Sequence, residues 1–395
     1  MSLTYSTAGE SHGPALVINV AGLPSGVTVD KDFINAELTR RQGGYGRGGR
    51  QRIEHDEIEV LTGVRSGRTT GAPVTLVIRN HDSRLDDPVK TPAVSRPRPG
   101  HADLAGSIKW LTTDCRDTLE RASARETASR VAAGALARCM LREFGIEAFG
   151  FVRSILDAHT KAAVTEENWR SMRDARDASE TYCPDQAVTD RQCAIIRQAK
   201  IDQTTVGGLI EAHIFGCPPG LGTCVDWRDK LDARLAYAVM GIQAIKSVEI
   251  GLGKDVASRP GHEVHDAIAF DPSQRNAHTL GFTRSSNNAG GTEGGMTNGQ
   301  PVVVRAAMKP IATLLRGMPS VDLNTKAPQQ SQYERSDVCA VSAASVVLEN
   351  VAAFEIARVF RDKFAGDSLT EVRAQHDLFL KHAAMLPLDG PRILP

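Results

Sequence analysis

"RASARETASRVAAGALARCM", residues 121–140, is the stretch that most clearly predicts a helix in this chain. Ser123 and Glu126 have the spacing of a capping box, which predicts that the helix begins near Ser123. Gly145 lies just beyond the periodic region and predicts where the helix ends. Apolar side chains recur at helical spacing through the stretch, at positions 128, 131, 135, 136, 139 and 140.

The rest of the chain mixes helices and strands without the regular alternation of a doubly wound sheet, so the expected fold class is α+β. No Ser/Pro/Gly-rich linker divides it, and we expect one domain over residues 1–395 with a flexible tail from about residue 385. Helices are predicted over 31–42, capped by Asp30, over 231–245, and over 344–364, closed by Gly366. Strands are predicted as a pair around a Gly/Pro turn in 15–29, as strand, turn and strand in 58–80, and over 207–218 and 301–310.

The composition excludes several classes of protein. The chain has 395 residues, 41% of them hydrophobic, and a net charge of zero, which argues against a dedicated nucleic-acid binder. Seven cysteines without a CxxC pair favour reduced thiols in a cytoplasm over disulfides or a zinc site. No apolar run approaches the roughly 20 residues of a membrane span, and no signal peptide is visible. We therefore expect a cytoplasmic protein that binds neither nucleic acid nor membrane.

"TAGESHGPAL", residues 7–16, places His12 between two glycines. Glycine on each side lets the backbone turn sharply or come close to another molecule. A lone histidine is common in surface turns, so this stretch by itself fits either a turn or a functional loop.

"RRQGGYGRGGRQR", residues 40–52, combines five arginines with five glycines. It satisfies GxGxxG, but a helix precedes it and a strand-like segment follows, which is the reverse of a dinucleotide fingerprint and excludes a Rossmann site. A solvated basic loop and a clamp for a polyanionic small molecule remain. The glycines favour the clamp, because they add close backbone approach to the charge of the arginines.

Two further segments carry candidate polar groups near the predicted long helix. "RPRPGHADLAG", residues 96–106, places His101 after Pro-Gly, where it fits a structural histidine equally well. The helix start at Ser123, beside Arg121 and Arg125, is either a phosphate site or simply a well-capped helix.

The second half offers three more segments. The glycine-rich stretch 284–301 passes directly into a strand, which favours an ordered loop that faces a ligand. "MKPIAT", 308–313, offers Lys309 and main-chain donors. Asp337, before the second long helix, either caps that helix or acts as a base. We find no metal-ligand pattern around His262 and His265, no GxSxG and no Walker sequence.

Eight blocks of this sequence resemble, in order, the signatures of the chorismate synthase family, from about Thr7 to Phe364. They are "GESHG", "GYGRGGR", "RPGHAD", "RASARETASRVAAGA", "MGIQAIKSVEIG", "NNAGGTEGGMTNGQP", "AAMKPIAT" and "RSDVCAV". The resemblance implies a β-α-β sandwich with internal pseudo-symmetry, assembled as a homotetramer. It also implies a lyase of aromatic amino acid biosynthesis, at the last step of the shikimate pathway. That reaction is a 1,4-anti elimination of phosphate from 5-enolpyruvylshikimate 3-phosphate, which yields chorismate and needs reduced FMN without net redox change.

The resemblance also implies roles for individual residues. His12 would be the general acid at the substrate phosphate, and His101 would lie beside the flavin ring. Asp337 would lie near flavin nitrogen 5 and help remove the proton at substrate carbon 6. Arg41 and Arg47 match positions assigned to substrate or NADPH. The FMN positions match Arg121, Ala122, Ser123, Gln243, Ala244, Gly294, Lys309, Pro310, Ile311, Ala312, Thr313 and Arg335.

The sequence alone leaves the source of reduced flavin and two rival functions open. The sequence leaves undecided whether the chain reduces its own flavin with NADPH or depends on an external flavin reductase. A non-catalytic anion- or RNA-binding protein is one rival, although only 5% of the residues are aromatic and base stacking needs aromatic side chains. An enzyme that uses FMN for net oxidoreduction is the other.

Overall fold

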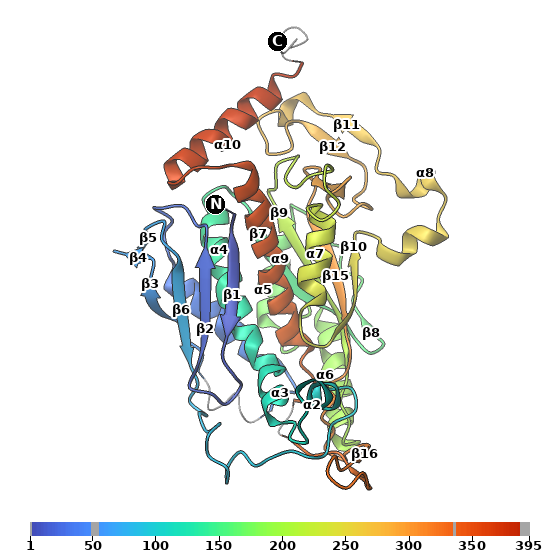
Figure 1. The fold of residues 1–395 in the computed structure, drawn as a ribbon. Helices are drawn as coiled ribbons and strands as arrows, with labels where there is room; N and C mark the ends of the chain where they lie inside the picture. Colours follow the sequence, from blue (N-terminus) through green and yellow to red (C-terminus); the bar gives the residue numbers. More distant parts are fainter. Residues whose placement is uncertain (1, 49–54, 335–336, 388–395) are drawn as a thin grey trace.

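The computed structural model describes residues 2–48, 55–334 and 337–387. Two antiparallel sheets form its outer layers (Figure 1). The first has the order β1-β2-β6-β3, with strands Thr4–Ala8, Ala15–Ala21, Val74–Arg79 and Glu59–Thr62. The second has the order β10-β15-β9-β7-β8, with strands Ile245–Ile250, Val302–Met308, Gly208–Phe215, Glu147–Ile155 and Ala158–His159.

Two long helices, α4 (Thr127–Arg142) and α9 (Val341–Lys363), lie between the sheets (Figure 1). Helix α4 packs on the first sheet and α9 on strands β7 and β9 of the second. Helix α1 (Lys31–Gln42) packs beside α4, and α7 (Leu231–Met240) packs beside α9. This arrangement confirms the predicted α+β class and shows a sandwich of sheet, helices and sheet. The single domain and the internal pseudo-symmetry stay predictions, although both halves place one long helix on an antiparallel sheet.

The remaining elements cover the edges and ends of the sandwich. Helices α5 (Trp169–Ala178) and α6 (Gln186–Ile201) lie against the second sheet, and α10 (Leu369–Ala384) follows α9. Among the described residues, none of the helices is long and apolar enough to span a membrane. The shorter elements are β4 (Val64–Arg65), β5 (Arg68–Thr69), α2 (Asp103–Trp110), α3 (Arg116–Arg121), α8 (Gly261–Val264), β11 (Ile268–Phe270), β12 (Phe282–Arg284), β13 (Thr292–Glu293), β14 (Met296–Thr297), β16 (Pro319–Val321) and β17 (Pro328–Gln330).

Two predicted boundaries are wrong. Only β2 forms within residues 15–29, because the chain turns at Gly22 and again at Gly26, both in the left-handed region, and makes only isolated bridges afterwards. The helix predicted over 231–245 ends at Met240, and Ala244 adopts a positive φ of 67° immediately before β10.

The predicted capping box at Ser123 is also wrong. The Ser123 hydroxyl accepts a hydrogen bond from the backbone N–H of Arg125 at 3.2 Å, and a 3₁₀ turn over Ala124–Glu126 separates it from α4. The Glu126 carboxylate does not return to Ser123. It bonds instead to Thr7, Arg130 and Gln243, because tertiary partners compete successfully with the local cap.

Helices α4 and α9 approach each other most closely at Gly134. A Cβ added to Gly134 would lie 2.2 Å from the backbone oxygen of Asn350 on α9, so only glycine fits. Buried charges tie the same helices to α1: Arg138 contacts Glu37 at 2.9 Å and Glu349 at 3.0 Å. Burial raises the pKa of Glu37, but Arg40 and Arg138 more than offset this and bring it down to about 2.

The methyl added by Gly134→Ala meets the backbone of α9, so we expect overpacking to cost about 3 kcal/mol, the upper end of the usual range. The gain in helix propensity returns about 1 kcal/mol, so the free energy of unfolding should fall by about 2 kcal/mol. Chemical denaturation monitored by circular dichroism measures the difference. A variant as stable as the unchanged chain would show that the two helices can separate at no cost.

Candidate active site

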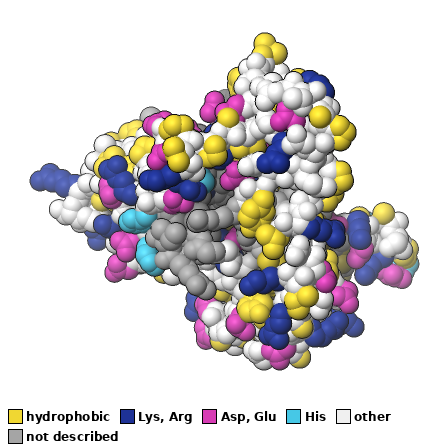
Figure 2. Space-filling model, turned by 90° about the horizontal axis from the view of Figure 1, so that it is seen from below, with side chains coloured by type: hydrophobic (Ala, Val, Ile, Leu, Met, Phe, Trp, Pro, Cys, Tyr) yellow, Lys and Arg dark blue, Asp and Glu magenta, His cyan; other side chains and the backbone are white. Residues whose placement is uncertain are grey.

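The sequence-predicted site residues lie mainly on loops at one end of the sandwich, the lower end in Figure 1, where α2, α3 and β16 lie. Figure 2 views the molecule from this end and shows histidine side chains together on one side, with acidic and basic side chains near them. Three small clusters of charged residues build this end, around His12, His101 and Asp337.

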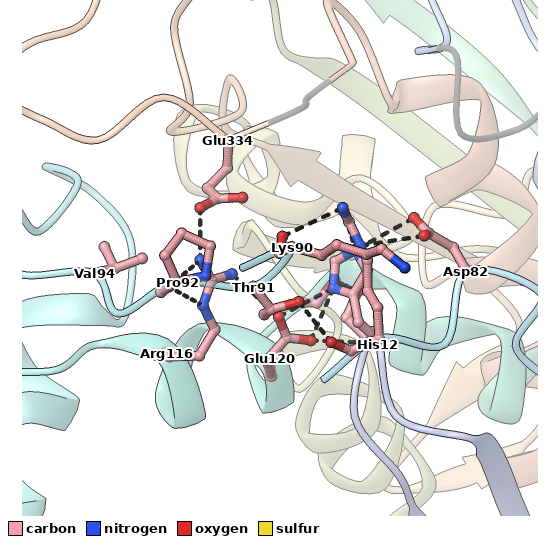
Figure 3. A network of polar contacts seen from close by, with 12 residues as sticks. His12, Asp82, Lys90, Thr91, Pro92, Val94, Arg116, Glu120 and Glu334 are labelled. Atoms are coloured by element: carbon pink, nitrogen blue, oxygen red, sulfur yellow. Dashed lines mark hydrogen bonds and ion pairs between the residues drawn. The ribbon is translucent and has the colours of Figure 1, made fainter. Parts of the chain in front are cut away.

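His12 is held by the last turn of α3. Its backbone N–H donates to the Glu120 carboxylate at 2.8 Å, and its ring Nδ1 lies 3.0 Å from both carboxylate oxygens. The other ring nitrogen, Nε2, lies 3.7 Å from Asp82 (Figure 3). Arg84 lies 3.4 Å from the same nitrogen. Since the ring is 14% exposed, Nε2 is the atom available for a proton transfer at the surface of the cluster.

A buried chain of charges supports the loop that carries His12. The Asn80 side-chain amide donates to the backbone oxygens of Glu10 and Gly13, and its own oxygen accepts from Arg125. Arg125 in turn pairs with Asp56 through one nitrogen, Nη1, which lies 2.6 and 2.7 Å from the two carboxylate oxygens. The loop is therefore fixed by side chains that come from three other segments.

Arg41 belongs to this supporting layer. The residue is 4% exposed, and its guanidinium lies 2.6 Å from Asp56, opposite Arg125. Burial is the main cause that lowers the pKa of Arg41, while burial raises the pKa of Asp56 and its two arginine partners bring it below the ordinary value. The predicted substrate or NADPH contact of Arg41 stays a prediction, and the structure places this side chain behind the His12 loop.

His101 rests on a second buried carboxylate. Its Nδ1 contacts Asp103, whose fully buried carboxylate also accepts from Arg98 at 2.8 and 3.0 Å. Burial raises the pKa of Asp103, but the hydrogen bonds from His101 and Arg98 outweigh it, so the net shift is strongly downward. Arg98 also donates to the Thr313 hydroxyl at 2.9 Å and so joins the His101 loop to the segment 309–313.

Lys309 closes the same loop from the other side. Its ammonium group donates to the backbone oxygen of Gly100, and its backbone N–H donates to Ala244. Burial and the neighbouring charge of Lys246 lower the pKa of Lys309. The segment 309–313 thus contributes a cation and a hydroxyl group next to His101.

Asp337 meets the glycine-rich arginine loop. Its carboxylate accepts from the backbone N–H of Gly48 at 2.6 Å and pairs with Arg47 at 2.9 Å. It does not cap α9, which begins at Val341. Of the five arginines in residues 40–52, Arg50 and Arg52 lie outside the described residues.

The segment 318–334 contacts the clusters around His101 and His12. Ser320 donates to the backbone oxygen of Pro97 next to the His101 loop, and Glu334 pairs with Arg116 at 3.1 Å. Arg116 also contacts Glu120, which holds His12 (Figure 3). One described stretch of backbone therefore links two of the three clusters.

The structure brings together most of the positions that the resemblance assigns to FMN. Arg121 donates to the backbone oxygens of Thr7 and Gly9, and Ser123 contacts Ser11 in the His12 loop. Gln243 donates to Glu126 at the start of α4, while its buried side-chain oxygen has no hydrogen-bond partner in the described part of the chain.

Gly294 is the exception among these positions. Its neighbour Gly295 accepts from the backbone N–H of Leu231 at the first turn of α7, whereas Gln243 follows the last turn of that helix. A helix of ten residues, about 15 Å long, thus separates Gly294 from the others within one chain. Arg335 lies outside the described residues.

Sequence reasoning missed the partners that hold the site. Glu120, Asp82, Arg84 and Asp56 carry no motif, and Glu120 lies 108 residues from His12 in the chain. Arg98 and Asp103 lie within a quoted block, and their spacing around His101 was the one available signal.

Comparisons with known proteins agree with one another. A family model described as chorismate synthase matches residues 3–360. Chorismate synthase from Desulforamulus reducens is 50% identical over 383 residues, which cover 94% of this chain and 97% of that protein. The one from Geobacter sulfurreducens is 50% identical over 395 residues, which cover 96% and 99%. A crystal structure of chorismate synthase matches with a TM-score of 0.80 and 37% identity, over 98% of this chain and 99% of that chain.

We expect Asp56→Asn to cost about 3–5 kcal/mol of stability, because it leaves two buried guanidinium groups facing each other. The stabilisation from Asp56 is present above its ordinary pKa of 3.8 and is lost as the pH falls below it, so the variant flattens the acid side of the stability curve. Thermal unfolding between pH 3 and 7 measures both effects.

The matched control is Glu59→Gln, which removes an exposed ion pair with Arg79. Because exposed pairs contribute little, we expect this control to melt like the unchanged chain. Equal melting temperatures for Asp56→Asn and the control would contradict the role given to the buried pair.

Proposed function

The chain belongs to the chorismate synthase family, the lyases of the last step of the shikimate pathway, and we propose that it converts 5-enolpyruvylshikimate 3-phosphate to chorismate with reduced FMN. The observation that carries the proposal is the support of His12, whose Nδ1 is held by Glu120 so that Nε2 faces Arg84 and Asp82. A phosphate leaving group needs a proton or a positive charge at such an atom. General acid catalysis of this kind contributes about 10²–10⁴-fold in rate.

The surroundings of His12 suit an anionic substrate. The Arg84 guanidinium lies beside Nε2, and the substrate itself would bring a phosphate and two carboxylates. Arginine binds such groups through paired hydrogen bonds, and a partly buried site strengthens each of them. We assign Arg47 to the same site, because it lies on the glycine-rich loop and pairs with Asp337.

Asp337 is the proposed base for the proton at substrate carbon 6. The Gly48 N–H and the Arg47 guanidinium fix the direction of its carboxylate. Positioning of this kind matters because a base must come within hydrogen-bond reach of the proton that it removes. His101, held by Asp103, is assigned to the flavin side of the site.

The residues present fit FMN. Arg121 and Lys309 are cations, and Ser123 and Thr313 carry hydroxyl groups. The buried side-chain oxygen of Gln243, which has no hydrogen-bond partner among the described residues, can accept a hydrogen bond. We assign the cofactor to these side chains and the backbone of 309–313, with Ala122, Ala244 and Gly294 as further contacts. When bound, reduced FMN would supply an electron-rich ring to the reaction, which consumes no reductant overall.

We also propose that NADPH is the source of electrons, that the protein works in the cytoplasm, and that it assembles as a homotetramer. The hairpin of β11 and β12 projects from the sandwich and exposes Ile268, Phe270 and Phe282, which supports assembly through contacts between chains (Figure 1). Light scattering on the purified protein tests the assembly and should give four times the chain mass of 42.5 kDa.

The function is tested by anaerobic turnover. Purified protein is mixed with 5-enolpyruvylshikimate 3-phosphate and chemically reduced FMN, and chorismate is followed by its absorbance. We expect many turnovers with the flavin still reduced at the end. Consumption of reductant in step with product would support a net oxidoreductase, and no product from folded protein would support an anion-binding protein.

The same assay, started from oxidised FMN and NADPH, separates the two sources of reduced flavin. Turnover without further protein would show a reductase activity in this chain. Turnover only after addition of a flavin reductase would show that an external partner supplies the reduced flavin.

We expect Asp337→Asn to retain FMN binding and to slow elimination by about 10²–10⁴-fold, since it removes the proposed base but keeps the side-chain shape. Fluorescence titration measures FMN binding, and the anaerobic assay measures turnover. An Asn variant that turns over like the unchanged chain would remove Asp337 from the mechanism.

A further inference from the structure

Glu120 contacts both the backbone and the ring of His12. Its carboxylate accepts from the His12 backbone N–H at 2.8 Å and lies 3.0 Å from Nδ1 through both oxygens, while its own backbone oxygen accepts from Ser11. The backbone N–H and the ring Nδ1 of His12 thus both bond to the Glu120 carboxylate, which fixes the position of the loop and the rotation of the ring. The Nδ1–H tautomer is thereby selected, and Nε2 is the atom left to exchange a proton.

The carboxylate is buried and keeps its charge. Its side chain is fully buried, and Arg116 contacts it at 3.3 Å from the preceding turn of α3. Burial raises the pKa of Glu120, but the hydrogen bonds from His12 and the charge of Arg116 outweigh burial and lower it. Arg116 is itself anchored by the backbone of Pro92 at 2.8 Å and by Glu334 (Figure 3).

Three charged groups face the imidazole from two sides. Glu120 lies on the Nδ1 side, and Asp82 and Arg84 lie on the Nε2 side. Arg84 disfavours a second positive charge next to it, although the same cation suits a phosphate. The Glu120 carboxylate on the Nδ1 side counters that repulsion by placing an anion against the ring, while Nε2 faces Arg84 and Asp82.

We propose that Glu120 is a positioning residue for the reaction, which holds His12 as an Nδ1-bonded imidazolium ready to donate from Nε2. The inference rests on the proposed function. As the bond between substrate carbon 3 and the phosphate oxygen breaks, the Nε2 proton moves to that oxygen. Phosphate leaves with the bonding electron pair, and a neutral imidazole remains with its Nδ1–H on Glu120. Glu120 touches neither substrate nor cofactor and acts only through His12.

Glu120→Gln tests the proposal, because glutamine keeps the size and one acceptor but removes the charge. We expect kcat to fall roughly 10²-fold with KM nearly unchanged, a loss within the range of general acid catalysis. The alkaline limb of the kcat profile should move to lower pH, since the protonated ring has lost its anion. In a His12→Ala background, Glu120→Gln should lower kcat no further.

Glu211→Gln is the matched control. Glu211 is also a buried carboxylate bonded to a histidine, with Nε2 of His213 at 2.6 Å, but it lies on β9 outside the candidate site. This control should lose stability and keep the pH profile of the unchanged chain. Equal pH profiles for Glu120→Gln and Glu211→Gln, or additive losses of kcat in the His12→Ala background, would overturn the proposal.

Two measurements keep the test decisive. If Glu120→Gln does not fold, Glu120→Asp is the second variant, because it retains the charge. It should keep the alkaline limb of the kcat profile at the same pH. It should lower kcat in the chain that has His12 but not in the His12→Ala background. The second measurement is ¹⁵N NMR of protein with labelled histidines, which follows the titration of the ring nitrogens without substrate and without turnover. The His12 ring, identified by its loss in His12→Ala, should titrate at lower pH in Glu120→Gln. If the His12 ring titrates at the same pH in Glu120→Gln as in the unchanged chain, the proposed pairing of Glu120 with His12 is refuted, even if the protein forms chorismate. If the titration shifts but the protein forms no chorismate, only the proposed reaction is refuted.

Discussion

The contact between α4 and α9 at Gly134 is the constraint on which the rest of the structure depends. Because the backbone of Asn350 leaves no room for a side chain at Gly134, the two helices cross at one fixed place. Arg138, Glu37 and Glu349 then lock that crossing to α1 through buried ion pairs. A buried network of this kind is strongly destabilising when one partner is removed, so it leaves the helices little freedom to slide.

The helix pair also determines where the site lies. Helix α4 is entered from the segment that carries Glu120, Arg121 and Ser123, and α9 is entered from the segment that carries Asp337. Each predicted catalytic group has a charged partner: Glu120 for His12, Asp103 for His101 and Arg47 for Asp337. Groups that are already oriented before the substrate binds cost no reorganisation energy during the reaction. This preorganisation is the usual source of electrostatic catalysis.

The sequence predicted the elements whose signals are local. Helical periodicity located α4 and α9, and alternating or apolar runs located β9 and β15. The prediction of a capping box was wrong because the Glu126 carboxylate accepts hydrogen bonds from Thr7, Arg130 and Gln243. No local sequence pattern predicts these partners. The family blocks named His12, His101 and Asp337, whose roles stay predictions. The supporting residues Glu120 and Asp56 lay beyond prediction, since their contacts join segments far apart in the chain.

We propose that the substrate phosphate binds at Nε2 of His12. A crystal structure of the protein with 5-enolpyruvylshikimate 3-phosphate and oxidised FMN measures this most directly. We expect a phosphate oxygen within hydrogen-bond distance of His12 Nε2, with Nδ1 still on Glu120. A phosphate bound away from His12, or a His12 ring turned off Glu120 in the complex, would contradict it.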